Sequence, residues 1–193
     1  SRERIAIELK KAVCGENIKV LAPLINSGSL EFIGIKACPD FNAVVKCKAS
    51  LDLALFVFLY TAKCDVLLSL DQLKSSNKLK NYCKSLLNLL ASPVPQNKAE
   101  IKKSLINSGF DIFSDYLLLR NALFNEDSSY LKTLLDEIIK NNEPYLIPHL
   151  KINGAELEAL GISGKEIGKT LERLRNSVIE NPLLNTKERL IEL

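Results

Sequence analysis

Apolar residues recur along most of this chain at intervals of three or four, the spacing that places them on one face of an α-helix. Near the start, Ile5, Leu9 and Val13 follow this spacing, while Lys10 and Lys11 point outward. No sustained alternation of apolar and polar residues is long enough to support a sheet. The pattern therefore predicts an all-α fold.

Residues that stop a helix separate the predicted elements, chiefly glycine, Asn-Ser-Gly and proline. The stretch 50–60 is so uniformly apolar that we expect it to be buried on all sides. The string LINSG occurs at 24–28 and 105–109, which indicates either two helix stops or an internal repeat. The predicted helices cover residues 4–13, 18–25, 41–47, 50–60, 78–90, 98–107, 110–121, 128–141, 155–160 and 165–179. The side chains of residues 75–77 can cap the helix at 78–90.

Two proline-containing segments divide the chain. Residues 91–95 break the helical pattern, and Pro144 with Pro148 excludes a helix interior between them. We therefore expect a second, smaller module to begin near residue 143. Within it, the segment LGISGKEIGKTLERLRN predicts a short helix, a left-handed cap at Gly161, a turn at Ser163-Gly164 and a long helix from Lys165. The apolar face of this long helix carries Ile167, Leu171, Leu174 and Val178.

The start of this last helix is a candidate anion site. Its free backbone N–H groups at Gly164-Lys165 could hold a nucleic-acid phosphate. Gly168, one turn later, would leave room for close approach of another backbone. Alternatively, the glycines only cap helices and Gly168 only packs against a neighbouring helix.

A run of lysines is the second candidate. Lys74 with Lys78, and Lys80 with Lys84, are like-charged pairs four residues apart, which slightly destabilise a helix. Tyr82 lies among them. The pattern indicates a polyanionic partner, or else an ordinary solvated helix face.

Composition adds little to these two candidates. The 193 residues are 47% hydrophobic and 25% charged, and a net charge of +3 is too small by itself to identify a nucleic-acid binder. The longest apolar run, residues 53–62, is far shorter than the roughly 20 residues that span a bilayer, so we do not expect this chain to be a membrane protein. The chain contains no methionine, which suggests an excised fragment.

The cysteines indicate a reduced, cytoplasmic location, because they are odd in number and lack the spacing of a zinc site. They are Cys14, Cys38, Cys47, Cys64 and Cys83. His149 has no nucleophile or metal-ligand pattern around it, and the acidic pairs 126–127 and 136–137 do not suggest a two-metal site. As it stands, the chain is expected to catalyse nothing.

Three segments resemble the tRNA nucleotidyltransferase and poly(A) polymerase family, specifically the bacterial-type enzymes that build or repair the CCA end of tRNA. SRERIAIELKK is similar to the end of the neck domain of that family, and LKSSNKLKNYCKSLLNLL to its body. LKINGAELEALGISGKEIGKTLERLRNSVIEN is similar to its tail signature, although Ser163 stands where the family often has proline. The matching residues are Ser1, Glu3, Arg4, Ile5, Glu8, Leu9, Leu73, Ser76, Asn77, Lys78, Lys80, Gly154, Glu156, Leu157, Leu160, Gly161, Ile162, Gly164, Ile167, Gly168 and Leu171.

The resemblance implies three parts: the end of the neck helix at 1–16, a helical body at 17–142 and a tail module at 143–193. Such parts hold the tRNA acceptor arm and elbow, with no membrane or DNA partner expected. Arg4 and Glu8 would stabilise the neck helix, and Arg4 would pair with a nucleotide-reading motif that lies upstream. The candidate phosphate contacts are Lys78, Lys80, Lys84, Gly164, Lys165, Gly168 and Lys169.

The family's catalytic head and the first part of its neck are missing from this sequence, together with their metal-binding carboxylates. The resemblance therefore implies Mg²⁺ and CTP or ATP only for the full-length enzyme, and no cofactor for these residues. Two alternatives stay open at this point. One is a poly(A) polymerase of the same family, and the other is a helical protein-interaction module without an RNA partner.

Overall fold

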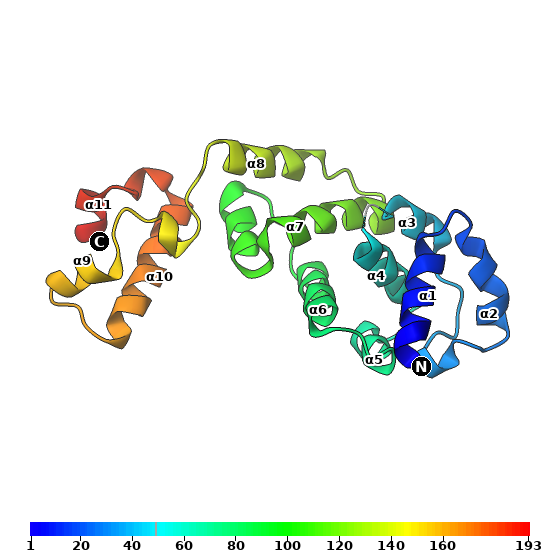
Figure 1. The fold of residues 1–193 in the computed structure, drawn as a ribbon. Coiled ribbons are helices and arrows are strands. Elements are labelled where there is room, and N and C mark those ends of the chain that lie inside the picture. The colour runs from blue at the N-terminus through cyan, green and yellow to red at the C-terminus, as the bar shows by residue number, and fades with distance from the viewer. Residues whose placement is uncertain (49) are drawn as a thin grey trace. The chain divides into compact units, whose positions relative to one another are not determined.

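The computed structural model describes residues 1–48 and 50–193. Over this part of the chain it contains eleven α-helices and four short 3-10 helices, and no strand (Figure 1). The predicted all-α fold is confirmed. The α-helices are α1 Arg2–Cys14, α2 Ala22–Asn26, α3 Phe41–Lys46, α4 Leu51–Thr61, α5 Val66–Gln72, α6 Asn77–Ala91, α7 Lys98–Phe124, α8 Ser129–Lys140, α9 Gly154–Ala159, α10 Lys165–Glu180 and α11 Lys187–Ile191.

Local side-chain chemistry explains where many helices begin. The hydroxyls of Ser1, Ser50 and Ser76 each accept a hydrogen bond from a backbone N–H of the first turn, and Asp40 and Asp65 do the same with a carboxylate. These bonds satisfy donors that have no partner within the helix. The predicted cap of the lysine-rich helix at residues 75–77 is confirmed at Ser76.

Some predicted elements differ from the structure. Residues 18–25 form a 3-10 helix, Ile18–Leu21, followed by α2, because Pro23 has no backbone N–H to donate and favours the first turn of a helix. Helices α5 and α11 were not predicted. Pro148 lies within the 3-10 helix Ile147–His149, as expected from a proline that cannot lie in the interior of an α-helix.

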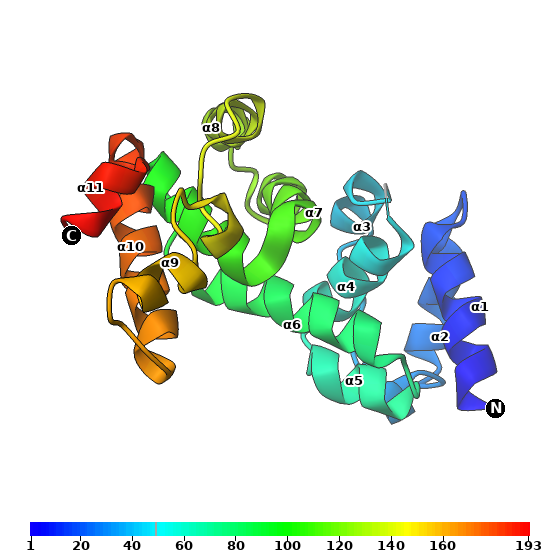
Figure 2. The same ribbon diagram turned by 60° about the vertical axis from the view of Figure 1, so that its left-hand side comes forward.

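The chain divides into two compact units, residues 1–93 with 111–128 and residues 94–110 with 129–193. Unit 1 is built around α4, on which α1 and α3 both pack (Figures 1 and 2). Every residue of α4 from Leu53 to Leu59 is buried, which confirms the expectation for these residues, whereas Leu51 in the first turn is exposed. Burial of a helix on all sides is what a continuous apolar run requires.

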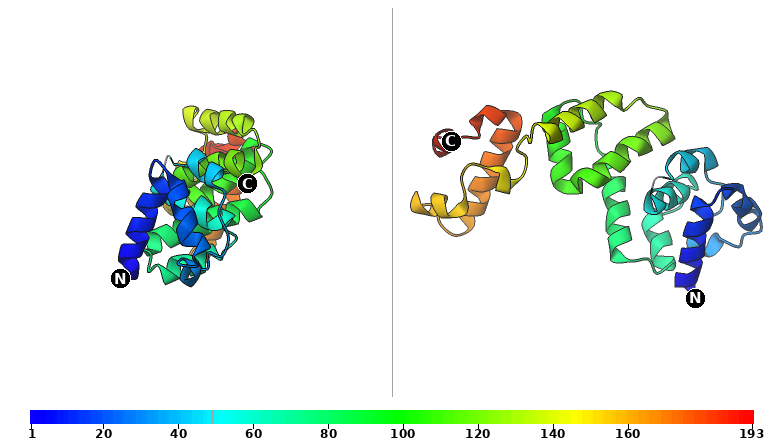
Figure 3. Two further views of the ribbon diagram at one scale, coloured as in Figure 1. Left: turned by 90° about the vertical axis from the view of Figure 1, so that its right-hand side faces the viewer. Right: turned by 45° about the horizontal axis from the view of Figure 1, so that its top comes forward.

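Unit 2 contains the C-terminal helices, which gather along α10 (Figure 3). Leu174 and Val178 of α10 pack in a cluster with Leu157 of α9 and Leu190 of α11. The predicted apolar face of α10 is confirmed, since Ile167 and Leu171 also pack against this cluster. The remaining members of the cluster are Leu150, Ile152, Ile162 and Leu184.

The boundary between the units passes through α7. Its two halves were predicted as separate helices, and this is confirmed, because Gly109 breaks the helical backbone between them with a φ of 77° and a ψ of 171°. This backbone conformation is essentially restricted to glycine. Gly28 also has a positive φ, 74°, at the end of α2, so both LINSG strings carry glycine in a conformation that other residues avoid.

The predicted division at residues 16 and 142 remains a prediction about functional parts. The spatial units do not share these boundaries, because residues 1–16 pack in unit 1 with the helices that follow, and the first half of α7 belongs with α8 and the tail.

In the described part of the chain no single helix is long and apolar enough to cross a membrane. The bent pair α4 and α5 passes by length and composition, with 115° between its helices, but the apolar residues of α4 form the core of unit 1. All five cysteines are unpaired. Burial raises the pKa of Cys47 to about 11 and that of Cys83 to about 12, so both thiols stay protonated at neutral pH.

Candidate nucleic-acid interface

The lysines of α6 divide into exposed and paired residues. Leu79, Cys83 and Leu86 form the buried face of this helix, and Lys78 and Lys84 are exposed. Neither lysine has an ion pair or side-chain hydrogen bond within the described residues. At 3.6 residues per turn, these two side chains are about 120° apart around the helix, so they do not form one continuous stripe.

The ammonium group of Lys80 is already paired with a carboxylate, which makes Lys80 a weaker candidate for a phosphate contact. Its Nζ lies 2.5 Å from a carboxylate oxygen of Asp71, and its side chain is only 28% exposed. Lys74 lies before the helix and pairs with Glu3 at 3.3 Å. Of the predicted lysine run, only Lys78 and Lys84 are therefore available to a polyanion without breaking an ion pair.

Tyr82 is anchored inside unit 1. Its hydroxyl donates a 2.6 Å hydrogen bond to Asp115, a residue in the second half of α7. Burial and this bond both raise the pKa of Tyr82, and burial also raises the pKa of Asp115. The ring thus contributes to the packing of α6 rather than offering a surface for stacking.

The turn before α10 has the predicted shape. Gly161 and Gly164 have φ values of 90° and 59°, and Gly164 caps α10 without a side-chain hydrogen bond. The amides of Glu166 and Ile167 make 3.3 Å bonds to the carbonyls of Ser163 and Gly164. Fewer N–H groups are therefore free for an anion than the sequence indicated.

Gly168 does not have the predicted packing role. A Cβ atom at this position would meet no atom within 4 Å, and the residue is exposed. Among the described residues, no helix packs against Gly168, so the expectation that it packs against a neighbouring helix is wrong. Space is open on this side of α10, and the close approach of another backbone stays a prediction.

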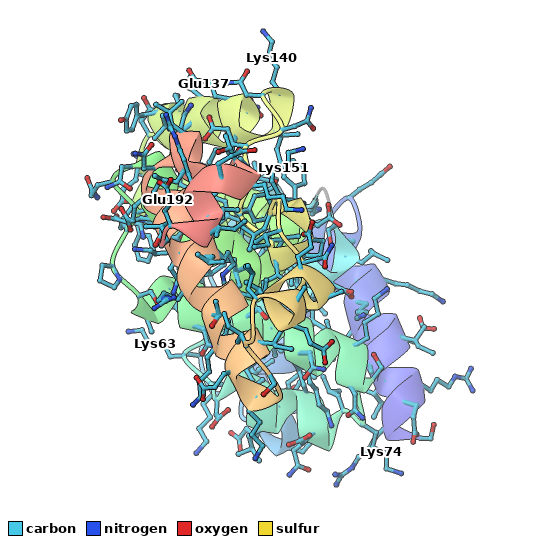
Figure 4. The ribbon with its side chains drawn as sticks, turned by 90° about the vertical axis from the view of Figure 1, so that its left-hand side faces the viewer. Lys63, Lys74, Glu137, Lys140, Lys151 and Glu192 are labelled. Carbon is cyan, nitrogen blue, oxygen red and sulfur yellow. The ribbon has the colours of Figure 1, made fainter. Side chains whose placement is uncertain are left out.

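The two lysines near the start of α10 differ in their partners. Lys169 pairs with Glu166 at 2.7 Å, one helical turn away. Lys165 has no ion pair among the residues that the structure describes. Figure 4 shows α10 in front, with charged side chains extending from its outer surface.

The residues assigned to the neck motif lie on α1. Glu8 pairs with Lys11 at 3.1 Å. Hydrogen bonds from the backbone and from Ser1, together with the nearby Lys74, lower the pKa of Glu3. Arg4 is exposed and lines an apolar groove of about 510 Å³ beside α1, and its pairing with an upstream motif stays a prediction.

His149 has a structural role. Its Nδ1 accepts hydrogen bonds from the N–H groups of Tyr145 and Leu146, at 3.3 and 3.4 Å, and its ring lies edge-on to that of Tyr145. Within residues 1–48 and 50–193, no three His, Cys, Asp or Glu side chains are grouped so that they could hold a metal ion. These residues therefore do not fit a Mg²⁺ site.

Sequence reasoning missed three cations. Lys103, Arg173 and Arg175 line an open groove in unit 2 together with Lys169. The four-residue spacing of Lys165, Lys169 and Arg173 was a usable signal on one helix. Lys103 lies far from them in sequence and on a different helix, so only the fold brings it to the same place.

Comparison with known proteins gave one match. A search of curated proteins and a search of solved structures each found none. A family model described as "tRNA nucleotidyltransferase domain 2 putative" matches residues 49–193, about three quarters of the chain. This match includes the lysine-rich α6 and the whole tail. The chain therefore belongs to the tRNA nucleotidyltransferase domain 2 family.

Proposed function

We propose that this chain is the C-terminal part of a bacterial-type tRNA nucleotidyltransferase that adds or repairs the 3′ CCA end with CTP and ATP. In this proposal the chain holds the acceptor arm and elbow of tRNA. A catalytic head, supplied by another part of the enzyme, adds the nucleotides. The family match over residues 49–193 carries the proposal.

The chemistry of the exposed cations supports a positioning role. Lys78, Lys84 and Lys165 present unpaired ammonium groups, as far as the described residues show. An ammonium group interacts with phosphate as a point charge and does not read sequence. Contacts of this kind suit an enzyme that must accept many different tRNAs, because duplex RNA is bound largely through its shape and backbone.

Binding of fluorescently labelled tRNA at several salt concentrations tests the proposal, with an RNA duplex that lacks the elbow as the comparison. We expect tighter, salt-dependent binding of the intact tRNA. Lys78→Gln and Lys165→Gln should each weaken binding equally for different tRNA sequences and lower the salt slope by about one unit.

Lys80→Gln is the matched control on α6, because Asp71 already neutralises that side chain. It should change the salt slope less than Lys78→Gln does. If wild-type protein does not bind tRNA, or if it binds the short duplex equally well, the positioning role is contradicted. Adding a catalytic head in trans and measuring incorporation of CMP and AMP, or of AMP alone, then separates CCA addition from polyadenylation.

A further inference from the structure

An open groove of about 760 Å³ lies in unit 2 between the first half of α7 and α10. Four cations line it, Lys103 from α7 and Lys169, Arg173 and Arg175 from α10, against the two carboxylates of Glu172 and Glu180. The groove is therefore positively charged, although the whole chain has a net charge of only +3.

The α10 wall of the groove is a regular array. Lys169 and Arg173 continue the four-residue spacing that starts at Lys165, so the three cations lie on one side of the helix and about 6 Å apart along it. The side chains of Leu174 and Val178 point to the opposite side, into the core of the tail. The core therefore holds the array in a fixed orientation.

The α7 wall is held in the same way. Lys103 and Asn107, four residues apart, line the groove, whereas Ile101 and Leu105 of the same helix are buried. Lys102 is also turned inward, where it pairs with Glu143 at 2.8 Å. Of the neighbouring lysines 102 and 103, only the second therefore faces the groove.

The cations of the groove make only weak ion pairs within the protein. Lys103 pairs with Glu180 at 2.6 Å, and Lys169 pairs with Glu166 at 2.7 Å. The lysine and the glutamate of each pair are more than half exposed. Exposed ion pairs of this kind contribute little to the stability of the fold, so their lysines can exchange one anionic partner for another. In the described residues Arg173 has no ion pair or side-chain hydrogen bond, and Arg175 bonds to Asn176 alone, at 3.3 and 3.4 Å.

We propose that this groove binds the sugar–phosphate backbone of duplex RNA through Lys103, Lys169, Arg173 and Arg175. This inference rests on the proposed function, which gives RNA as the partner. It adds the binding site on unit 2. Guanidinium groups match phosphate with two parallel N–H donors, and the amides of Asn107 and Asn176 can bond to 2′-hydroxyls.

The composition of the groove favours duplex RNA over other polyanions. Among the residues that the structure describes, no aromatic side chain lines it, whereas single strands are usually held by stacking of bases on aromatic rings. Ile106 is the one apolar residue in this described lining, so an acidic peptide would lack the buried anchors on which protein interfaces depend.

Fluorescence anisotropy with tRNA and with a plain RNA duplex tests the groove. We expect Arg173→Gln and Arg175→Gln each to weaken binding of both RNAs roughly five- to tenfold at about 0.1 M salt, and each to lower the salt slope by about one unit, because one cation is removed. Lys103→Gln should have a smaller effect, because Glu180 already pairs with Lys103. Lys132→Gln and Lys140→Gln, on α8 of the same unit, are charge-matched controls and should change neither; Lys140 points away from α8 (Figure 4).

A variant that is expected to bind RNA more tightly provides an independent test. Glu180→Gln releases Lys103 from its ion pair, so we expect RNA to bind more tightly and with a steeper salt slope. Glu192→Gln, an exposed residue near the C-terminus, removes the same charge outside the groove and is the control (Figure 4). Circular dichroism should show unchanged folding for every variant.

The outcomes are distinguishable. If wild-type protein binds tRNA and the groove variants bind it with the same affinity as Lys132→Gln, the proposal that the groove binds RNA is contradicted and the proposed function stands. If the groove variants lose an acidic peptide or single-stranded RNA rather than duplex RNA, the assigned ligand is wrong. If wild-type protein binds no RNA, the proposed function fails and the groove fails with it.

Discussion

Gly161 and Gly168 lie seven residues apart in the tail and have different backbone conformations. Gly161 ends α9 with φ of 90°, a region that favours glycine, whereas Gly168 lies within the helical turns of α10. Both positions are open, since a Cβ atom would meet nothing within 4 Å at either. Space therefore cannot explain both glycines, and only at Gly161 does the backbone require one.

We predict opposite effects of alanine at these two positions. Gly168→Ala should raise the free energy of unfolding by about 0.5–1 kcal/mol, because glycine is a poor helix former. Gly161→Ala should lower it by about 1 kcal/mol or more, because alanine is strained at positive φ. Urea unfolding followed by circular dichroism measures both changes.

RNA binding by Gly168→Ala adds a second readout. If an RNA backbone approaches α10 at this glycine, the variant should be more stable and yet bind tRNA more weakly. Higher stability with unchanged tRNA affinity would remove Gly168 from the proposed RNA contacts.

The pairing of α7 with α8 depends on a partly buried ionic cluster. Glu143, just after α8, accepts from Lys98 at 2.7 Å and from Lys102 at 2.8 Å, and Lys98 also pairs with Glu137 at 2.9 Å. The side chain of Lys102 is 1% exposed. Although burial raises the pKa of Glu143, the bonds from the two lysines outweigh it, so this pKa lies below its ordinary value of 4.5.

We predict that Glu143→Gln lowers the free energy of unfolding by about 3 kcal/mol at pH 7, because it leaves the buried Lys102 without a counter-charge. The carboxylate stabilises the fold above its unfolded pKa, near 4.5, and this contribution is lost as the pH falls through the lower folded pKa. The difference between variant and wild type should therefore shrink in acid. Urea unfolding at pH 7 and at pH 3 measures it.

Glu137→Gln is the control within the same cluster. Within the described residues the carboxylate of Glu137 pairs only with Lys98, and its side chain is 48% exposed, so we expect a loss below about 1 kcal/mol. Equal losses for the two variants would contradict the role assigned to burial. The double variant Lys102→Met with Glu143→Leu should recover most of the stability, because it leaves no buried charge.

In the described residues α4 is buried within unit 1, a hydrophobic cluster surrounds α10 in unit 2, and α7 contributes a half to each unit. The breaks between units fall after Pro93, Phe110 and Ser128. The second break follows Gly109, the one non-helical residue within α7. Each unit can therefore lose structure to a different extent.

Hydrogen exchange tests this division. We predict that the amides of α4 exchange most slowly, because this helix is buried on all sides. Glu143→Gln should accelerate exchange in α8 and in the first half of α7 and leave α4 unchanged. An equal acceleration in α4 would mean that the two units unfold together.

Parts of the candidate site could be read from the sequence and parts could not. The turn at Gly161 and Gly164, the cap at Ser76 and the long helix from Lys165 were predicted, because each depends on residues within about four positions of one another. The pairing of Lys80 with Asp71 and the anchoring of Tyr82 by Asp115 were missed. Their partners belong to other helices, and helical periodicity does not say which helices meet.

The sequence by itself determined that the chain is helical, where most helices begin and end, and which face of each one is apolar. The tertiary structure alone decided what the charged residues do. Lys102 and Lys103 are neighbours of the same type, yet the fold buries the first against Glu143 and leaves the second in the groove with Arg173. The physical reason is range: helix formation depends on near neighbours along the chain, whereas the environment of a charge depends on groups that only folding brings together.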